Sequence, residues 1–365
     1  MNNSRQDHLS KVVIKGFKSI KKDKIDLSNI NVLIGANGAG KSNFISVFEM
    51  VQRLLVQELA LYTGKKGITS LFYNGKEATE IISIEFHFGN DTYSYEVEWT
   101  DNNNLVFRDE ICIFSGNELL RGSGYIESRA LNKLRQAQND VYVPQIMLNP
   151  SWRIYQFHDT SSSSRIKSEH NISNCAVFIN DGRNLAAFLY RLKIHFPKEY
   201  ANILNAIKLV APFFNDFVLE PGELNEEHII LRWHKKDCID ILNASQLSDG
   251  TLRFICLATL LLQPTDLQPS TIIIDEPELG LHPFAIVILA EMIQKAAINK
   301  QIIIATQSVE LLDKFDVDDV IVVDNDKDGS KFTRLEREQL KHWLEDEYSL
   351  GELWNKNILG GRFSR

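Results

Sequence analysis

Runs of apolar residues separated by polar turns predict strands and helices in the N-terminal part of the chain. Positions 12–14 and 30–34 are apolar except for Asn31 and mostly β-branched, as in buried strands. A glycine-rich loop follows the second run. Beyond it, apolar residues recur every three or four positions, which predicts a helix from near Ser42 whose buried face holds Phe44, Ile45, Val47, Phe48, Val51, Leu54 and Leu55. The predicted order is strand, loop, helix.

The middle of the chain carries a weaker pattern. Apolar and polar residues alternate over 82–88 and 93–99, which predicts a β-hairpin with one buried face. Residues 115–175 are mixed and polar, include the serine run 161–164 and show no clean period, so we expect an exposed insertion or a mobile loop. Helical periodicity returns over 185–194 and 200–210, and strands are predicted at 217–219 and 229–233.

The last third of the chain alternates helices with short apolar strands. A helix from Ser248 is followed by a strand at 272–274, a helix at 284–297 and strands at 302–305 and 320–323. Strands that alternate with helices predict an α/β fold with a parallel sheet. We see no internal repeat or heptad run, so no long coiled coil is expected.

Composition narrows the class of protein. The 365 residues are 44% hydrophobic and 24% charged, as in ordinary globular proteins. The net charge of −8 excludes a histone-like mode of binding nucleic acid, so any such contact needs a local basic patch. The four cysteines form no CxxC pair, and neither a signal core nor a membrane-length apolar stretch occurs. We expect a cytoplasmic protein with reduced thiols and no membrane contact.

Residues 35–42 read Gly-Ala-Asn-Gly-Ala-Gly-Lys-Ser and fit the pattern GxxxxGK[ST] at every fixed position. In such a loop the glycines let backbone N–H groups surround phosphates, the lysine places a charge near the β and γ oxygens, and the serine hydroxyl ligates Mg²⁺. The strand before the loop and the helix after it strengthen the prediction. A plain glycine turn is the alternative.

Two further motifs lie in the last third of the chain. Asp275 and Glu276 follow a buried strand, so Asp275 is predicted to hold the Mg²⁺ shell and Glu276 to polarise the attacking water. Ser248 and Gly250 open the helix upstream of that strand, with Ser248 as a plausible N-cap. Taken alone, either motif could be only a strand tip or a helix cap.

In this order, the motifs resemble the head of an ABC-type ATPase, closest to the SMC/RecF/OLD-like group. The resemblance covers roughly residues 10–60 and 240–325, and it rests also on Asn37, Asn43, the segment 14–19 and the segment 275–283. It implies an ABC-type P-loop ATPase head with a mixed sheet, an antiparallel β subdomain and a helical insertion. The parts we expect are an N-terminal ATPase lobe (1–114), an insertion (115–240), a C-terminal ATPase lobe (241–330) and a tail (331–365).

The same resemblance implies a homodimer. In that family two heads face each other, and the signature loop of one closes over the nucleotide held by the other. Carried over, Ser248 and the Gly250 backbone contact a γ-phosphate across the interface, and residues 278–282 run along it. The residues expected to bind ATP are Gly35, Asn37, Gly38, Ala39, Gly40, Lys41, Ser42, Asn43, Ser248 and Gly250.

The sequence departs from this family pattern at two positions, and a third residue is assigned only by expectation. Gln307 stands where many heads place a histidine, and it cannot become charged, so slow turnover is expected. Asp249 replaces the usual first glycine of the signature. A glutamine lining the metal is expected in mid-chain, and Gln156 is our candidate, beside Ser42 and Asp275 as metal residues; Glu276 and Gln307 are the catalytic candidates.

Other patterns in the sequence have ordinary structural explanations. Residues 324–329 copy the first half of a calcium loop, but Leu335 occupies its twelfth position, so a solvated turn is expected. His158 beside Asp159 is expected to be structural. Basic residues cluster near the N-terminus and again in mid-chain. They form solvated faces, a path for DNA or RNA, or contacts to the nucleotide base: Lys15, Lys18, Lys21, Lys22, Lys24, Arg129, Lys133 and Arg135.

The function expected from all this is an ATP-hydrolysing, Mg²⁺-dependent dimer that senses or clamps nucleic acid. OLD-type relatives carry a TOPRIM nuclease, and only about 40 residues follow Asp324, so the effector is expected to be a separate protein, such as a nuclease, in anti-phage defence. Alternatives are the ATPase subunit of an ABC transporter, a DNA repair or recombination ATPase, and a scaffold that binds ATP without cleaving it. Leu350, Leu353 and Trp354 fit either an effector-paired tail or a packed C-terminal cap.

Overall fold

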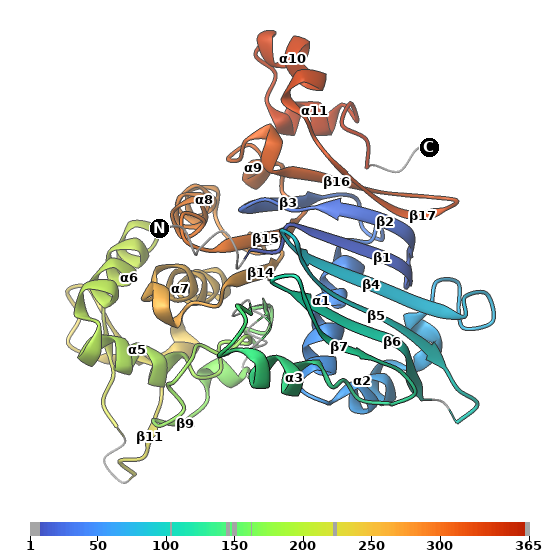
Figure 1. The fold of residues 1–365 in the computed structure, drawn as a ribbon. Helices are drawn as coiled ribbons and strands as arrows, with labels where there is room; N and C mark the ends of the chain where they lie inside the picture. Colours follow the sequence, from blue (N-terminus) through green and yellow to red (C-terminus); the bar gives the residue numbers. More distant parts are fainter. Residues whose placement is uncertain are drawn as a thin grey trace. The chain divides into compact units, whose positions relative to one another are not determined.

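The computed structural model describes residues 8–361 except 103, 144–146, 148–151, 162 and 222–224. The chain divides into two compact units (Figure 1). Unit 1 comprises Met1–Ile154, Ser270–Ile273 and Lys300–Arg365, and unit 2 comprises Tyr155–Pro269 and Ile274–Asn299. The four-part division expected from the sequence stays a prediction.

An antiparallel sheet forms one part of unit 1. Within the described residues it has six strands in the order β2-β1-β4-β5-β6-β7. Their bounds are β1 Lys11–Phe17, β2 Ile20–Asp26, β4 Ile81–Phe88, β5 Asp91–Trp99, β6 Leu105–Phe114 and β7 Asn117–Gly122. Ile84 lies opposite both Ile14 and Tyr95, and all three are buried. The predicted hairpin over 82–99 and its buried face are therefore confirmed.

A second sheet supplies the parallel strands. Its order over the described residues is β17-β16-β3-β15-β14-β8, with β3 parallel to β15 and β16, and β17 antiparallel to β16. The strands are β3 Ile30–Ile34, β8 Arg153–Tyr155, β14 Thr271–Asp275, β15 Gln301–Thr306, β16 Val320–Asp326 and β17 Gly329–Arg334. The predicted mixed sheet is confirmed, with its parallel strands nearly continuous in apolar residues because both faces are covered.

Helix α1 (Lys41–Leu55) connects the two sheets of unit 1 through a shared apolar core. All seven apolar residues predicted for its inner face are buried. They belong to one cluster with Phe86 of the antiparallel sheet and with Ile303 and Val323 of the parallel one. The other helices described in this part are α2 Leu59–Lys66, the 3₁₀ turn Ile68–Leu71 and α3 Ala130–Ala137.

The expectation of an exposed or mobile segment over 115–175 is wrong for much of its described part. This stretch contains β7, α3, β8 and the short strand β9 (His170–Asn171). Trp152 is 1% exposed, with its ring centroid 5.1 Å from that of Phe48 and 4.8 Å from that of Phe86. Trp152 packs against residues that are distant in the chain. No local pattern in the sequence therefore marks it as buried.

Glu110 is a buried carboxylate whose partners all lie in unit 1. It accepts hydrogen bonds from the hydroxyls of Tyr93 (2.9 Å), Tyr125 (2.8 Å) and Ser128 and from the N–H of Arg129 (3.1 Å). Four donors satisfy the charge of this fully buried group, which fastens the start of α3 to β6.

We expect Glu110→Ala to lower the free energy of unfolding by about 2 to 4 kcal/mol, because buried hydroxyl donors lose their acceptor. Urea denaturation followed by circular dichroism measures the change. Glu118→Ala removes an exposed carboxylate on the neighbouring strand and should leave the urea midpoint unchanged. Equal midpoints for the two variants would contradict the role given to Glu110.

Unit 2 is mainly helical, as Figure 1 shows in green to orange. Its helices are α5 Leu185–His195, α6 Pro197–Val210, α7 Asp249–Leu262 and α8 Pro283–Ala296, with 3₁₀ turns at Arg165–Lys167, Ala244–Gln246 and Thr265–Leu267. A small antiparallel sheet has the order β10-β12-β13, formed by Phe214–Val218, Arg232–Lys235 and Ile241–Asn243. The single strand predicted over 229–233 is wrong, because β11 (His228–Ile229) pairs with β9 whereas β12 pairs with β10 and β13.

The C-terminal part of unit 1 is packed. It holds α9 Val309–Leu312, the 3₁₀ turn Val317–Asp319, α10 Arg337–Glu345 and α11 Leu350–Asn355. Leu350, Leu353 and Trp354 are all buried, which favours the packed cap among the two interpretations of this segment. In the described part of the chain, every helix is too short or too polar to cross a membrane.

Candidate nucleotide-binding site

The glycine-rich loop of unit 1 lies between the end of β3 and the start of α1. Gly38 and Gly40 have φ angles of +80° and +120°, a region that side-chain-bearing residues rarely adopt. A Cβ on Gly40 would also overlap the hydroxyl of Ser330. The two glycines therefore let the backbone curl tightly at the N-terminus of α1, where N–H groups and the helix dipole favour an anion.

Lys41 is the first residue of α1, and its ammonium group folds back over the loop. Its Nζ donates to the carbonyl oxygens of Gly35 (2.6 Å) and Ala36 (3.2 Å). The side chain is only 6% exposed, so these bonds compensate for burying its charge. The charge is thereby held inside the curve of the loop, where a phosphate would sit.

Residues from distant parts of unit 1 hold the loop in place, and the sequence did not reveal them. The Asn325 amide donates to the Gly38 oxygen (3.3 Å), and the Ser330 hydroxyl donates to the Ala39 oxygen (2.6 Å). The N–H of Ala36 donates to the oxygen of Gly361 (2.9 Å). The calcium-like motif covers the end of β16 and the turn before β17, and its acids are exposed to solvent, as expected.

Asn43 and Gln307 are placed beside the loop in different ways. The Asn43 amide donates to the Ser19 hydroxyl (2.7 Å) from the first turn of α1. Gln307 follows Thr306, which pairs with Ile34 in the parallel ladder between β15 and β3. Gly35 follows Ile34, so Gln307 and the loop leave the same edge of the sheet from neighbouring strands. Asn37 and Ser42 are exposed within the loop and at the start of α1.

Unit 2 brings the predicted acidic motif together with Gln156. The Nε2 of Gln156 lies 3.1 Å from Oδ2 of Asp275, and Nε2 of His158 lies 3.2 Å from the Asp275 carbonyl oxygen. Glu276 has a φ of +47°, a conformation that costs a residue with a side chain about 1 kcal/mol or more. Such strain at the tip of a strand is typical of functional positions.

The start of α7 has the predicted cap. The Ser248 hydroxyl accepts from the N–H of Thr251 (3.2 Å), and both residues are near the exposed end of the helix. A Cβ on Gly250 would overlap the carbonyl oxygen of Gly280, so a glycine is needed for this turn to pack against the segment after Glu276. Contact of Ser248 and Gly250 with a phosphate stays a prediction.

Arg253, which the sequence patterns did not single out, connects three segments of unit 2. From the second turn of α7 it donates to the carbonyl oxygens of Phe157 (3.2 Å), His158 (3.0 Å) and Leu279 (2.8 Å). The segment of Gln156, the start of α7 and the turn after Glu276 are thus fixed to one guanidinium group. His158, expected to be structural, contributes to the same arrangement.

Acidic neighbours accompany much of the N-terminal lysine cluster. Lys21 pairs with Asp328 (2.8 Å), and Lys15 and Lys24 each have a carboxylate at 4.0 Å, from Glu85 and Asp26. Burial lowers the pKa of Lys18, with a smaller contribution from the charge of Lys66. These partners weaken the cluster as a path for nucleic acid, whose phosphates need net positive charge.

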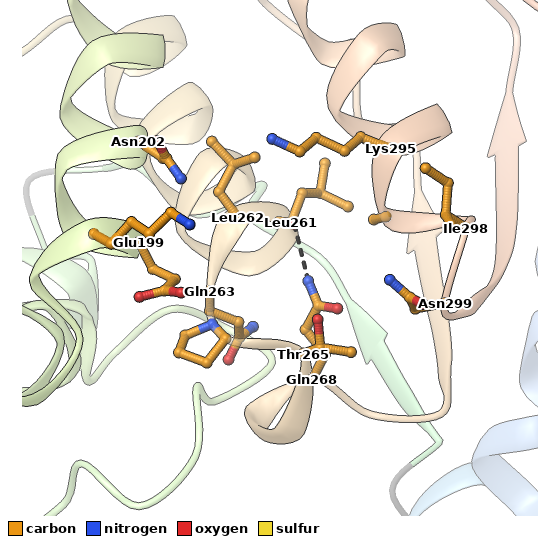
Figure 2. Close-up of a pocket in the computed structure, with 13 residues that line it drawn as sticks. Glu199, Asn202, Leu261, Leu262, Gln263, Thr265, Gln268, Lys295, Ile298 and Asn299 are labelled. Atoms are coloured by element: carbon orange, nitrogen blue, oxygen red, sulfur yellow. Dashed lines mark hydrogen bonds between the residues drawn. The ribbon is translucent and has the colours of Figure 1, made fainter. Parts of the chain in front are cut away.

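A separate hollow of about 330 Å³ lies on unit 2, where α6 begins and α7 and α8 end. Figure 2 shows Glu199, Lys295 and Asn299 among the polar side chains around it. Gln268 extends along its wall and donates to the Leu261 oxygen at 2.9 Å. None of the predicted site residues is among the described residues that line it, so we do not place the phosphate chemistry there.

Comparisons with known proteins bear on the fold and the family. The family AAA_21, described as "AAA domain, putative AbiEii toxin, Type IV TA system", matches residues 30–313. A crystal structure of the SmcHead bound to the C-winged helix domain of ScpA has a TM-score of 0.60 at 18% identity, over 92% of this chain and 99% of the other. A second Smc head domain, with an extended coiled coil and bound to the C-terminal domain of ScpA derived from Pyrococcus furiosus, has a TM-score of 0.58 at 17% identity, over 93% and 99%. No curated protein matches.

The fold is that of the SMC heads, and the loop at the start of α1 has the predicted P-loop geometry, which agrees with the resemblance drawn from the motifs. The match to residues 30–313 covers more than half of the sequence. The chain belongs to the AAA_21 family.

Proposed function

We propose that two copies of this protein bind two ATP molecules between them and hydrolyse them. The observation that carries this proposal is the curled loop 35–42 at the start of α1, with Lys41 turned into its curve. In each copy, this loop and Asn43 hold the phosphates, and Ser248 with the Gly250 backbone of the second copy close over the γ-phosphate. The capped, exposed start of α7 supports that second role, because a helix N-terminus attracts an anion.

Each catalytic and metal candidate has a role in this proposal. Glu276 orients and polarises the attacking water as general base, and Gln307 hydrogen-bonds the γ-phosphate or the water. Ser42, Asp275 and Gln156 offer a hydroxyl, a carboxylate and an amide oxygen, which are the hard ligands that Mg²⁺ prefers. The 3.1 Å contact between Gln156 and Asp275 supports their acting together. Bound Mg²⁺ would neutralise charge on the phosphates.

An Mg²⁺ ion at this site does not require a cluster of protein side chains. Among the described residues, no group of three or more His, Cys, Asp or Glu side chains is placed to hold a metal ion. Mg²⁺ at a phosphate site usually needs only one or two carboxylates, since phosphate oxygens and water complete its shell. One carboxylate, from Asp275, therefore fits.

Exposed apolar residues on the turn after Glu276 and at the start of α8 support the homodimer. Leu279 is 44% exposed and Phe284 is 49% exposed, next to the segment that packs on Gly250. Buried between two copies, they would supply the apolar centre that stable interfaces contain. Residues 278–282 would then lie along the contact.

The test is the mass of the protein with a non-hydrolysable ATP analogue. We expect light scattering to show monomer without the analogue and dimer with it. Leu279→Asp should prevent the dimer without lowering analogue binding to the monomer more than about twofold. Ile239→Asp is the matched control, because Ile239 is 97% exposed on another turn of unit 2, and it should leave the dimer intact. A monomer in saturating analogue would contradict the proposal.

We base a proposal for the wider role of the dimer on the AAA_21 family and on the similar SMC heads. We propose that closure of the heads senses or clamps nucleic acid and regulates a separate effector such as a nuclease in defence against phage. The description of the AAA_21 family, with its toxin–antitoxin system, and the ScpA-bound SMC heads both support a partner protein. Copurification followed by mass spectrometry tests it, and a chain that purifies alone from its own cell would count against an effector.

A further inference from the structure

The phosphate-binding loop is held from outside by a directed chain of hydrogen bonds. The Ser330 hydroxyl donates its only hydrogen to the Ala39 oxygen at 2.6 Å. The hydroxyls of Ser19 and Ser330 lie 2.6 Å apart, so Ser19 must be the donor between them. The Asn43 amide in turn donates to Ser19 at 2.7 Å. The chain therefore runs Asn43, Ser19, Ser330, Ala39, and we call Ser19 and Ser330 the serine relay.

The end of the relay controls the direction of one peptide unit. In a planar trans peptide the C=O and the following N–H point in opposite directions. Because Ser330 holds the Ala39 carbonyl on the outer side, the Gly40 N–H is turned the other way, toward the interior of the curve. Ser330 is 1% exposed, so water does not compete for this bond.

A second peptide unit is held in the same manner by the C-terminal segment. The Ala36 N–H donates to the Gly361 oxygen at 2.9 Å. The Gly35 carbonyl, in the same peptide unit, points the opposite way and accepts from Nζ of Lys41 at 2.6 Å. Gly361 itself packs closely, since a Cβ there would lie 2.8 Å from Cγ1 of Val322 and 3.0 Å from the Trp354 ring.

We propose that the serine relay and Gly361 are positioning elements for phosphate binding: the C-terminal part of the chain sets the direction of the Gly40 N–H and of the Gly35 carbonyl before nucleotide arrives. This inference rests on the proposed binding of ATP at residues 35–42. Preorganised donors bind more tightly because little orientational freedom is lost on binding. The relay acts on affinity, whereas Glu276 acts on the chemical step.

The first test measures the Kd for a fluorescent ATP analogue, the KM and kcat for ATP, and the thermal midpoint without nucleotide. Ser330→Ala should raise Kd and KM roughly three- to tenfold, the effect of one buried hydrogen bond, and leave kcat at saturating ATP unchanged. Ser19→Ala should also raise Kd and KM, but less than Ser330→Ala does, because the Ser19 hydroxyl only orients that of Ser330. Thr333→Ala, an exposed change on the same strand, should alter none of these values.

The second test uses a pair of glycines with matched backbones. Gly360 and Gly361 have φ angles of +78° and +76°, so alanine strains both similarly, but a Cβ on Gly360 meets no atom within 4 Å. Gly361→Ala should displace the carbonyl that holds Ala36 and weaken analogue binding more than Gly360→Ala does. This pair keeps the proposal testable if Ser330→Ala does not fold.

Unchanged Kd and KM in Ser330→Ala, or equal Kd values for the two glycine variants, would overturn the positioning role. The variant Lys41→Ala shows whether only the positioning role is wrong or whether the proposed ATP site is wrong as well. If Lys41→Ala loses binding while Ser330→Ala keeps wild-type affinity, only the relay fails. If Lys41→Ala keeps wild-type affinity, the loop is not the ATP site at all.

Discussion

Replacing Glu276 with glutamine is expected to lower ATP hydrolysis at least about 100-fold and to leave ATP binding intact, because the amide cannot accept a proton from the attacking water. Glu276 lies at the strained tip of β14, next to Asp275 and its Gln156 contact, so the substitution removes one proton acceptor and changes the shape very little. Steady-state phosphate release measures the rate, and light scattering should show an ATP-bound dimer that persists.

Glu291→Gln is the matched control for that experiment. It makes the same change of charge at an exposed position of α8 in the same unit and should retain activity within about twofold. Wild-type turnover in Glu276→Gln would instead support a scaffold in which another group, or none, activates the water.

A mixture of two inactive variants should regain activity. Lys41→Ala removes the charge at the phosphates, and Ser248→Arg blocks the capped start of α7, so each alone is expected to lose nearly all hydrolysis. In a dimer with shared sites, a mixed pair contains one site with both defects and one with neither. An equimolar mixture should therefore recover up to about one quarter of wild-type activity, since half of the dimers are mixed and each has one intact site.

The control mixture combines Lys41→Ala with Glu276→Gln. In our proposal both residues serve the nucleotide of their own copy. On that assignment neither site of the mixed pair is intact, so no activity should return. Differently tagged copies establish that mixed dimers form. Recovery in the control, or none in the first mixture despite mixed dimers, would refute the shared site.

The sequence predicts well the structural features that depend on neighbouring residues in the chain. The face of α1, the hairpin of β4 and β5, and the cap at Ser248 each follow from a short period or one residue type, and all three are confirmed. It predicts poorly what depends on distant partners. Trp152 and Glu110 have no local signature, because their contacts come from other strands and helices.

The same limit applies to the site. Lys41, Asp275 and Glu276 belong to spaced motifs, and Gln156 was found only through the family pattern, yet it does contact Asp275. Arg253, Ser330 and Gly361 belong to no motif, since each acts on the carbonyl or N–H of another segment. Backbone partners of this kind put no constraint on side-chain type in the partner segment, so the sequence shows no trace of them.

The bond between Ser330 and Ala39 joins residues 291 positions apart, and this has a consequence during synthesis. The ribosome makes residues 35–42 first, and Ser330 follows Ala39 only after 291 further positions. Since domains are translated from the N-terminus at about 5 to 20 residues per second, the nascent chain would pass many seconds with this loop unsupported. The loop would then become able to bind ATP only after Ser330 is in place. Chains still on the ribosome would therefore not form the ATP-bound dimer too early.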